Sequence, residues 1–155
     1  MIKVNVFISN NGCKKDFKNA EKYLHSKIKK LYRDQKYFKN KNIEFTVKIT
    51  GASEIKKLNK KFTNKNKVTD ILSFPFYDQE QLKKLLKKKK LFYLGDIIIN
   101  LNEIKNKFDK KFSTKYFNNL WVHGLLHLLG HRHKKDKDYK KMLKLENSFL
   151  RSINK

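Results

Sequence analysis

The chain has 155 residues, 39% of them hydrophobic and 13% aromatic, which predicts one folded domain over residues 1–155 rather than a disordered basic tail. Its 39 Lys and Arg outnumber its 14 Asp and Glu, and the resulting charge of +25 at pH 7 favours a polyanion such as RNA or DNA as partner. Cys13 is the only cysteine, which excludes an intramolecular disulfide and a cysteine-based zinc knuckle and favours a reducing compartment.

The sequence carries no signal for export or membrane insertion. No stretch approaches the roughly 20 apolar residues of a membrane span, and residues 1–12 lack the apolar core and cleavage site of a signal peptide. We therefore expect a cytoplasmic protein without a membrane partner. The positive charge also has a simpler explanation, because an A+T-rich coding sequence enriches Lys, Asn, Ile and Phe.

The first half of the chain alternates predicted strands and helices. Apolar and polar residues alternate over 2–8 and again over 43–49, which predicts two half-buried strands. Helical spacing of apolar residues predicts helices over about 16–33 and 53–62, the second beginning at Ser53 as N-cap.

The second half adds two strands and three helices. Residues 71–76 predict an apolar strand in which Phe74 lies in the core, and Pro75 indicates a sheet edge or strand end. Residues 79–90 are lysine-rich and predict a solvated helical or flexible insertion, followed by a strand over 92–100. The remaining helices are predicted over 101–112, 114–129 and 137–153. This order predicts an α+β fold, with a small sheet packed with helices.

Four of the five histidines lie within eleven residues, 123–133. His123 and His127 are four residues apart on a predicted helix and point the same way, which favours a metal site over two separately buried core histidines. His131 on a straight helix would lie about 12 Å from His123, too far to share one ion. The helix must therefore end, and Gly130 permits this.

After such a break either His131 or His133 can return to the ion, and spacing does not choose between them. Three histidines without a cysteine leave a fourth position for water, which favours hydrolysis over a structural role. Helical metalloproteases place Glu directly after the first His, where this chain has Gly124. No general base is identified in the protein, so the metal-bound water is the expected reactive group.

Three ordered motifs resemble one known family. The block from His123 to His133 is similar to the H-G-x-L-H-L-x-G-Y-D-H signature of the YbeY family, bacterial endoribonucleases of rRNA maturation. Leu58-Asn59 and then residues 69–76 resemble its L-N…P-T-[DN]-V-L-S-F-P-F block, and residues 94–99 resemble its L-G-D-[IL]-V-I strand. Two residues on the predicted last helix also match, Met142 and Glu146.

The resemblance implies a mixed four-stranded sheet and one Zn²⁺ per chain, held by His123, His127 and His133. His131 then stands where the family has Tyr, and Arg132 where it has Asp. The implied activity is zinc-dependent endonucleolytic cleavage of single-stranded RNA. Its implied roles are maturation of the 3′ end of 16S (small-subunit) rRNA and ribosome quality control, with rRNA and the ribosome or its small subunit as partners.

One departure from the family affects RNA binding. The family carries an Arg where this chain has Thr63, so Lys61, Lys65 or Lys67 would have to contact the phosphates without a forked guanidinium. This loss keeps a second hypothesis open: a basic, ribosome-associated RNA-binding assembly factor whose metal is mainly structural.

Two acidic residues have plainer interpretations than metal ligation. Asp96 is expected to anchor a hydrogen bond. Glu146 either pairs with a surface lysine, which is the expected arrangement, or accepts a hydrogen bond from a histidine ring.

Overall fold

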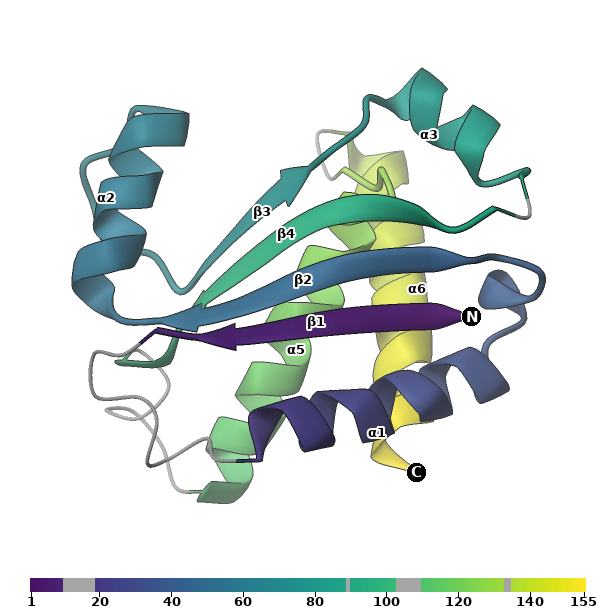
Figure 1. The fold of residues 1–155 in the computed structure, drawn as a ribbon, viewed down its shortest axis with the longest axis horizontal. Helices are drawn as coiled ribbons and strands as arrows, with labels where there is room; N and C mark the ends of the chain where they lie inside the picture. Colours follow the sequence, from purple (N-terminus) through teal and green to yellow (C-terminus); the bar gives the residue numbers. More distant parts are fainter. Residues whose placement is uncertain (10–18, 89, 103–109, 133–134) are drawn as a thin grey trace.

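A four-stranded mixed sheet, in the order β1-β2-β4-β3, organises the computed structural model of the chain (Figure 1). Strands β1 (Ile2–Ile8), β2 (Ile43–Thr50) and β4 (Phe92–Asn100) run parallel, and β3 (Ile71–Pro75) pairs antiparallel with β4. The predicted α+β class and mixed four-stranded sheet are confirmed. Pro75 ends an edge strand, as its missing N–H donor requires.

The structure describes residues 1–9, 19–88, 90–102, 110–132 and 135–155. In these ranges the helices are α1 (Ala20–Asp34), the short 3-10 helix η1 (Lys36–Phe38), α2 (Ala52–Thr63), α3 (Gln79–Leu85), α5 (Lys110–Leu128) and α6 (Asp136–Asn154). Among the described residues, no helix is both long and apolar enough to cross a bilayer.

Three predicted helix details change. Helix α2 begins at Ala52 with Gly51 as its N-cap, so Ser53 is not the cap. The lysine-rich insertion contains α3, whose start is fixed by a capping box between Asp78 and Gln81. Most of the helix predicted over 101–112 lies outside the described residues, but α5 is already helical at Lys110, so the predicted break at residue 113 is wrong.

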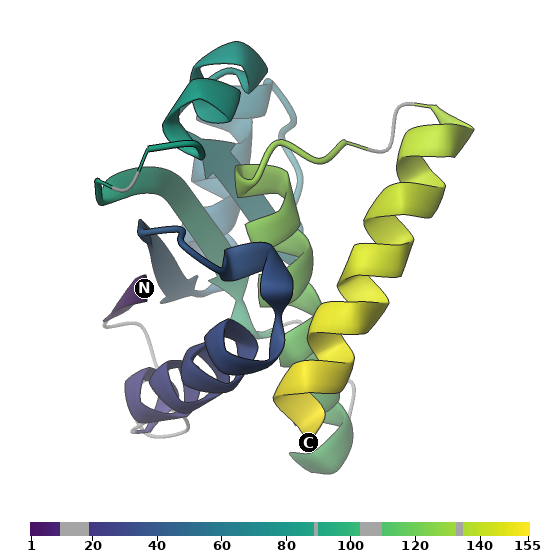
Figure 2. The same cartoon turned by 90° about the vertical axis from the view of Figure 1, so that its right-hand side faces the viewer.

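Helices α1 and α5 cover one face of the sheet, and α6 packs against these two helices to complete the core (Figures 1 and 2). Alternate residues of β2 and β4 are fully or almost fully buried beneath these helices, as period-2 strands require. Trp121, Phe117 and Phe149 supply the largest helical side chains of this core. The layer of helices therefore leaves the opposite face of the sheet to polar and aromatic side chains.

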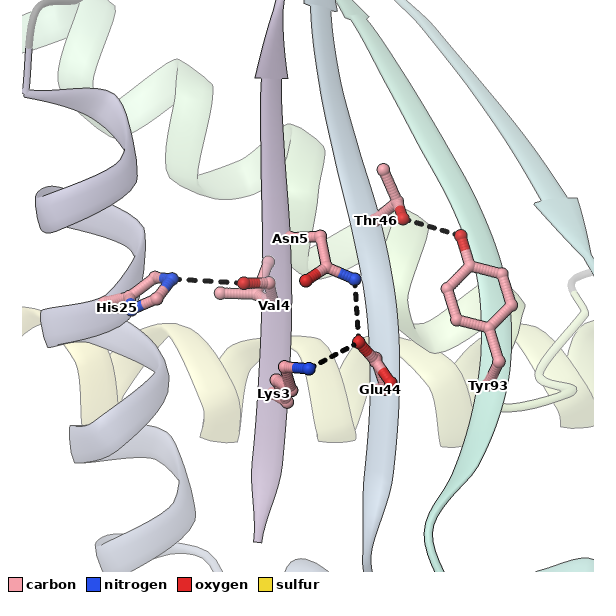
Figure 3. Close-up of polar contacts among 7 residues, drawn as sticks. All are labelled: Lys3, Val4, Asn5, His25, Glu44, Thr46 and Tyr93. Atoms are coloured by element: carbon pink, nitrogen blue, oxygen red, sulfur yellow. Dashed lines mark hydrogen bonds and ion pairs between the residues drawn. The ribbon is translucent and has the colours of Figure 1, made fainter.

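The open face of the sheet is ordered by hydrogen bonds, drawn in Figure 3. Glu44 accepts from Asn5 (2.8 Å) and pairs with Lys3 (3.1 Å). The Tyr93 hydroxyl lies 2.7 Å from a carboxylate oxygen of Asp96 and 2.6 Å from the Thr46 hydroxyl. Burial, reinforced by the Asp96 carboxylate, raises the pKa of Tyr93 to about 12. Asp96 is thus the hydrogen-bonding anchor that was predicted.

Phe74 belongs to this open face and not to the core, which corrects the prediction. It pairs with Asp96 across β3 and β4 and is half-buried. Its ring packs edge-on against exposed Phe62 of α2, with 5.2 Å between ring centroids. A strand at the sheet edge has one face under α5 and one face open, so its apolar residues are not all buried.

Glu54 ties the start of α2 to the sheet. Its carboxylate accepts hydrogen bonds from Ser9, which follows β1, and from Lys48 and Thr50 of β2. These donors, led by Lys48, lower the pKa of Glu54 from 4.5 to about 2.

We predict that Glu54→Gln lowers the thermal unfolding midpoint at neutral pH. The lost stabilisation should be at most about 1 kcal/mol, because both side chains of the ion pair are about one-third exposed and solvent screens their charges. A depressed folded-state pKa stabilises the fold above pH 4.5 and loses that effect as the pH falls toward 2. The difference between wild type and variant should therefore shrink over that window. The same substitution at exposed Glu21 is the control, and a difference independent of pH would contradict the assignment.

Candidate metal centre

Helix α5 presents a single polar stripe. Between Phe117 and Leu129 every residue is buried except Asn119, His123 and His127, which lie one helical turn apart. The rest of this segment packs against the sheet and α6, so the helix exposes only one line of side chains. The two predicted ligands of α5 therefore lie on the same exposed line.

Gly124 explains how α5 approaches the sheet so closely. A Cβ atom at this position would lie 2.8 Å from the Cγ2 of Ile97 in β4 and 3.1 Å from the Cδ1 of Ile71 in β3. A side chain at this position would force buried Ile97 to shift. The same contact leaves no room for a glutamate side chain. This explains why residue 124 is a glycine in this fold and not the glutamate base of a metalloprotease.

We predict that Gly124→Ala destabilises the protein by up to about 2 kcal/mol. Alanine gains about 1 kcal/mol of helix propensity, but the contact with buried Ile97 costs about 1–3 kcal/mol. The test is a double-mutant cycle. The free energy of unfolding is measured by denaturant for the wild type, Gly124→Ala, Ile97→Ala and the double variant. In the Ile97→Ala background the new methyl group should be neutral or stabilising, and an equal loss in both backgrounds would contradict the contact.

The two histidines of α5 turn the same ring nitrogen toward one point. Their Nε2 atoms lie 3.0 Å apart. The Nδ1 of His127 lies 3.0 Å from the main-chain oxygen of His131, and the Nδ1 of His123 lies 3.5 Å from a carboxylate oxygen of Glu146 in α6. Both oxygens are acceptors only, so each Nδ1 is the donor and each Nε2 presents its lone pair to the shared point.

The end of α5 positions the His131 carbonyl. Gly130 adopts a left-handed conformation (φ +83°), and the chain closes with two bonds, from Gly130 N–H to His127 O and from His131 N–H to Leu126 O, each 3.0 Å long. This is a Schellman motif, so the predicted helix break at Gly130 is confirmed. The turn brings the carbonyl of His131, rather than its ring, to the histidine pair.

The His131 ring lies away from that point. Burial lowers its pKa, its Nε2 is buried without a hydrogen bond from any described residue, and its nearest aromatic contact is Tyr37 at 6.3 Å between centroids. His133, the third predicted ligand, lies outside the described residues. In the ranges that are described, no three His, Cys, Asp or Glu side chains form a metal-binding group.

The histidine pair fits a tetrahedral zinc ion. Zn–N bonds of about 2.0–2.1 Å at tetrahedral angles separate two ligand nitrogens by about 3.3 Å, close to the 3.0 Å found between the Nε2 atoms. Acceptors behind both Nδ1 atoms are the usual support for metal-binding histidines. The arrangement at Glu146 replaces the surface pairing that the sequence had favoured.

The predicted RNA contacts lie in the last turn of α2 and in the loop that follows it. Lys61, Lys65 and Lys67 are all exposed. The loop that carries Lys65 and Lys67 is held by buried Asn59, whose side-chain amide donates to the Lys67 carbonyl (2.9 Å). The Thr63 hydroxyl donates to the main-chain oxygen of Asn59 (2.8 Å), so it closes the helix end and does not replace a guanidinium. The structural role of Asn59 was not inferred from the sequence, although the Leu-Asn motif marked it.

The fold and this site define an α+β protein with a histidine pair on a buried helix. A solution structure from Thermotoga maritima has this fold, with a TM-score of 0.59 and 23% identity, over 99% of this chain and 89% of that one. The sequence model of the family described as Endoribonuclease YbeY matches residues 7–154. The chain therefore belongs to the YbeY family of endoribonucleases.

Curated relatives with the name Endoribonuclease YbeY match over nearly their whole length. The protein of Pelagibacter ubique is 40% identical over 156 residues, covering 99% of this chain and 97% of the relative. A Buchnera aphidicola relative is 38% identical, covering 97% and 92%, and one from Thermodesulfovibrio yellowstonii is 36% identical, covering 86% and 89%.

Proposed function

We propose that this protein is a single-strand-specific, zinc-dependent endoribonuclease. The observation that carries the proposal is the convergence of two Nε2 lone pairs on the exposed stripe of α5, in a member of an endoribonuclease family. We further propose that it matures the 3′ end of 16S rRNA and takes part in ribosome quality control, which the family resemblance supports. Its partners would be rRNA and the ribosome or small subunit.

In this proposal His123, His127 and His133 hold one zinc ion. Bound zinc lowers the pKa of a coordinated water toward about 7 and so supplies a nucleophile at neutral pH. Glu146 and the His131 carbonyl hold the two rings with Nε2 forward, so no reorientation is needed on binding. Gly124 stands at the position where helical metalloproteases carry their glutamate base.

The lysines at the end of α2 and just after it hold the RNA backbone in this proposal. Lys61, Lys65 and Lys67 provide mobile point charges, which neutralise phosphates without fixing their orientation. Because Thr63 is bonded to Asn59, no forked donor replaces the family arginine at this position. The expected consequence is binding that depends strongly on salt.

We predict that His123→Ala reduces cleavage of single-stranded rRNA fragments by at least about 100-fold, because loss of even a supporting residue costs 10- to 100-fold. The substitution should also reduce zinc content from one ion per chain. His25→Gln is the matched control, since His25 lies on α1 and bonds the Val4 carbonyl (3.1 Å, Figure 3). The assay compares zinc-loaded and chelator-treated protein.

Unchanged cleavage by His123→Ala, or after chelation, would contradict the metal mechanism. RNA binding without cleavage by zinc-loaded wild type, together with a large loss of thermal stability on chelation, would instead identify an assembly factor with a structural metal.

We predict that Glu146→Gln weakens zinc affinity about tenfold, because a neutral amide is a poorer acceptor for the Nδ1–H of His123. Zinc affinity is measured by competition with a chromophoric chelator. Glu146→Asp should restore part of the affinity, and Glu21→Gln should leave it unchanged. Wild-type affinity in Glu146→Gln would show that this carboxylate does not support the site.

A further inference from the structure

A basic groove lies between α5 and α6, away from the lysines of α2. It encloses about 550 Å³ and is lined by Lys115, Asn119, Asn147, Leu150, Arg151, Asn154 and Lys155. We call this hollow the α5–α6 groove. The two helices lie side by side in both views of the fold (Figures 1 and 2), with the start of α5 near the end of α6.

The groove continues the exposed stripe that carries the histidines. Lys115, Asn119, His123 and His127 follow one another at intervals of four residues on α5. Eight residues separate Lys115 from His123, about 12 Å along the helix axis. On α6, Glu146 reaches His123, and the next residue, Asn147, already lines the groove. One polar track therefore joins the histidine pair to the groove.

The lining suits a phosphodiester strand. It contains three cations and three side-chain amides, and none of its residues is acidic. Lysine and arginine bind phosphates, while asparagine both donates and accepts and so can pair with base edges. Arg151 donates through Nε to the Asn147 carbonyl (3.3 Å), which positions its guanidinium, a group with four further N–H donors.

Two other surface hollows lack this character. The hollow lined by Gln79, Arg132, Lys135 and Asp138 includes a carboxylate, which repels phosphate. The hollow between β1 and α1 is lined largely by apolar side chains, among them Ile2, Val4 and Ile28. Charge and hydrogen-bonding capacity thus both favour the α5–α6 groove as a site for RNA.

We propose that single-stranded RNA bound at the histidine pair continues along the α5–α6 groove, with Lys115 and Arg151 on its phosphates and Asn119, Asn147 and Asn154 facing its bases. This inference rests on the proposed function and extends it, because it gives the substrate a second contact region that begins about 12 Å along α5 from His123. A strand that spans both regions is held in register with the histidines, whereas a short fragment reaches only one of them.

The test is binding of fluorescent single-stranded RNA by the double variant Lys115→Gln/Arg151→Gln. An oligonucleotide of about 12 nucleotides should bind about tenfold more weakly, and its slope of log affinity against log salt should fall by about 1.4, or 0.7 per lost phosphate contact. A dinucleotide should bind to the double variant with the same affinity as to the wild type. The single variants should each give about half the loss on the logarithmic scale.

The charge-matched control is Lys36→Gln/Lys39→Gln, which removes two exposed cations near η1. Equal weakening by the control, or unchanged binding of the longer RNA by the groove variants, would overturn the proposal. Cleavage that proceeds without any dependence on the groove would overturn it and leave the proposed function intact. Groove-dependent binding without cleavage by zinc-loaded wild type would support the groove and overturn the proposed function.

Discussion

The close packing of α5 on the sheet at Gly124 is the constraint on which the rest of the site depends. With no side chain at this position, the helix backbone approaches Ile97 and Ile71, and nearly all of its last four turns become buried. A helix buried on most of its surface can carry polar chemistry on only one line. His123 and His127 lie on that line, and so does the entrance to the α5–α6 groove.

Hydrogen bonds from distant elements then decide what the histidines can do. The Schellman turn at Gly130 directs a carbonyl to His127, and α6 directs Glu146 to His123. Both contacts place a proton on Nδ1 and leave Nε2 for a ligand. The geometry that suits zinc thus comes from one local turn and one helix–helix contact.

Several of the few carboxylates are engaged by hydrogen bonds and ion pairs within the fold. Glu44, Glu54 and Asp96 are engaged on or beside the open face of the sheet, by Lys3, Lys48 and Tyr93 respectively. Asp70 accepts from Tyr116. The 39 Lys and Arg far outnumber the 14 Asp and Glu, so a net charge of +25 attracts a polyanion even with these pairs formed.

Periodicity in the sequence placed the four strands and the helices α2 and α6 within one residue of their observed bounds, because it reflects burial along each element. The bounds of α1, α3 and α5 differ from the predicted ones by four or five residues at one end. The wrong details were those set by other parts of the fold. Phenylalanine is a residue type common in protein cores, but the register of Phe74 opposite Asp96 places it on the open face. Ser53 is a good N-cap by residue type, but the helix begins one residue earlier, directly after Gly51. Glu146 was expected to pair on the surface because its partner is 23 residues away.

The sequence by itself determined the histidine spacing, the helix end at Gly130 and the family motifs, since these depend on neighbours within about one helical turn. It also showed that Gly124 occupies the position where helical metalloproteases have a glutamate base. Only the tertiary structure decided why that glycine is required, which nitrogen each histidine presents, and that Lys115 and Arg151 meet in one groove. These features depend on contacts between elements far apart in the chain, and local sequence patterns do not predict which elements pack together.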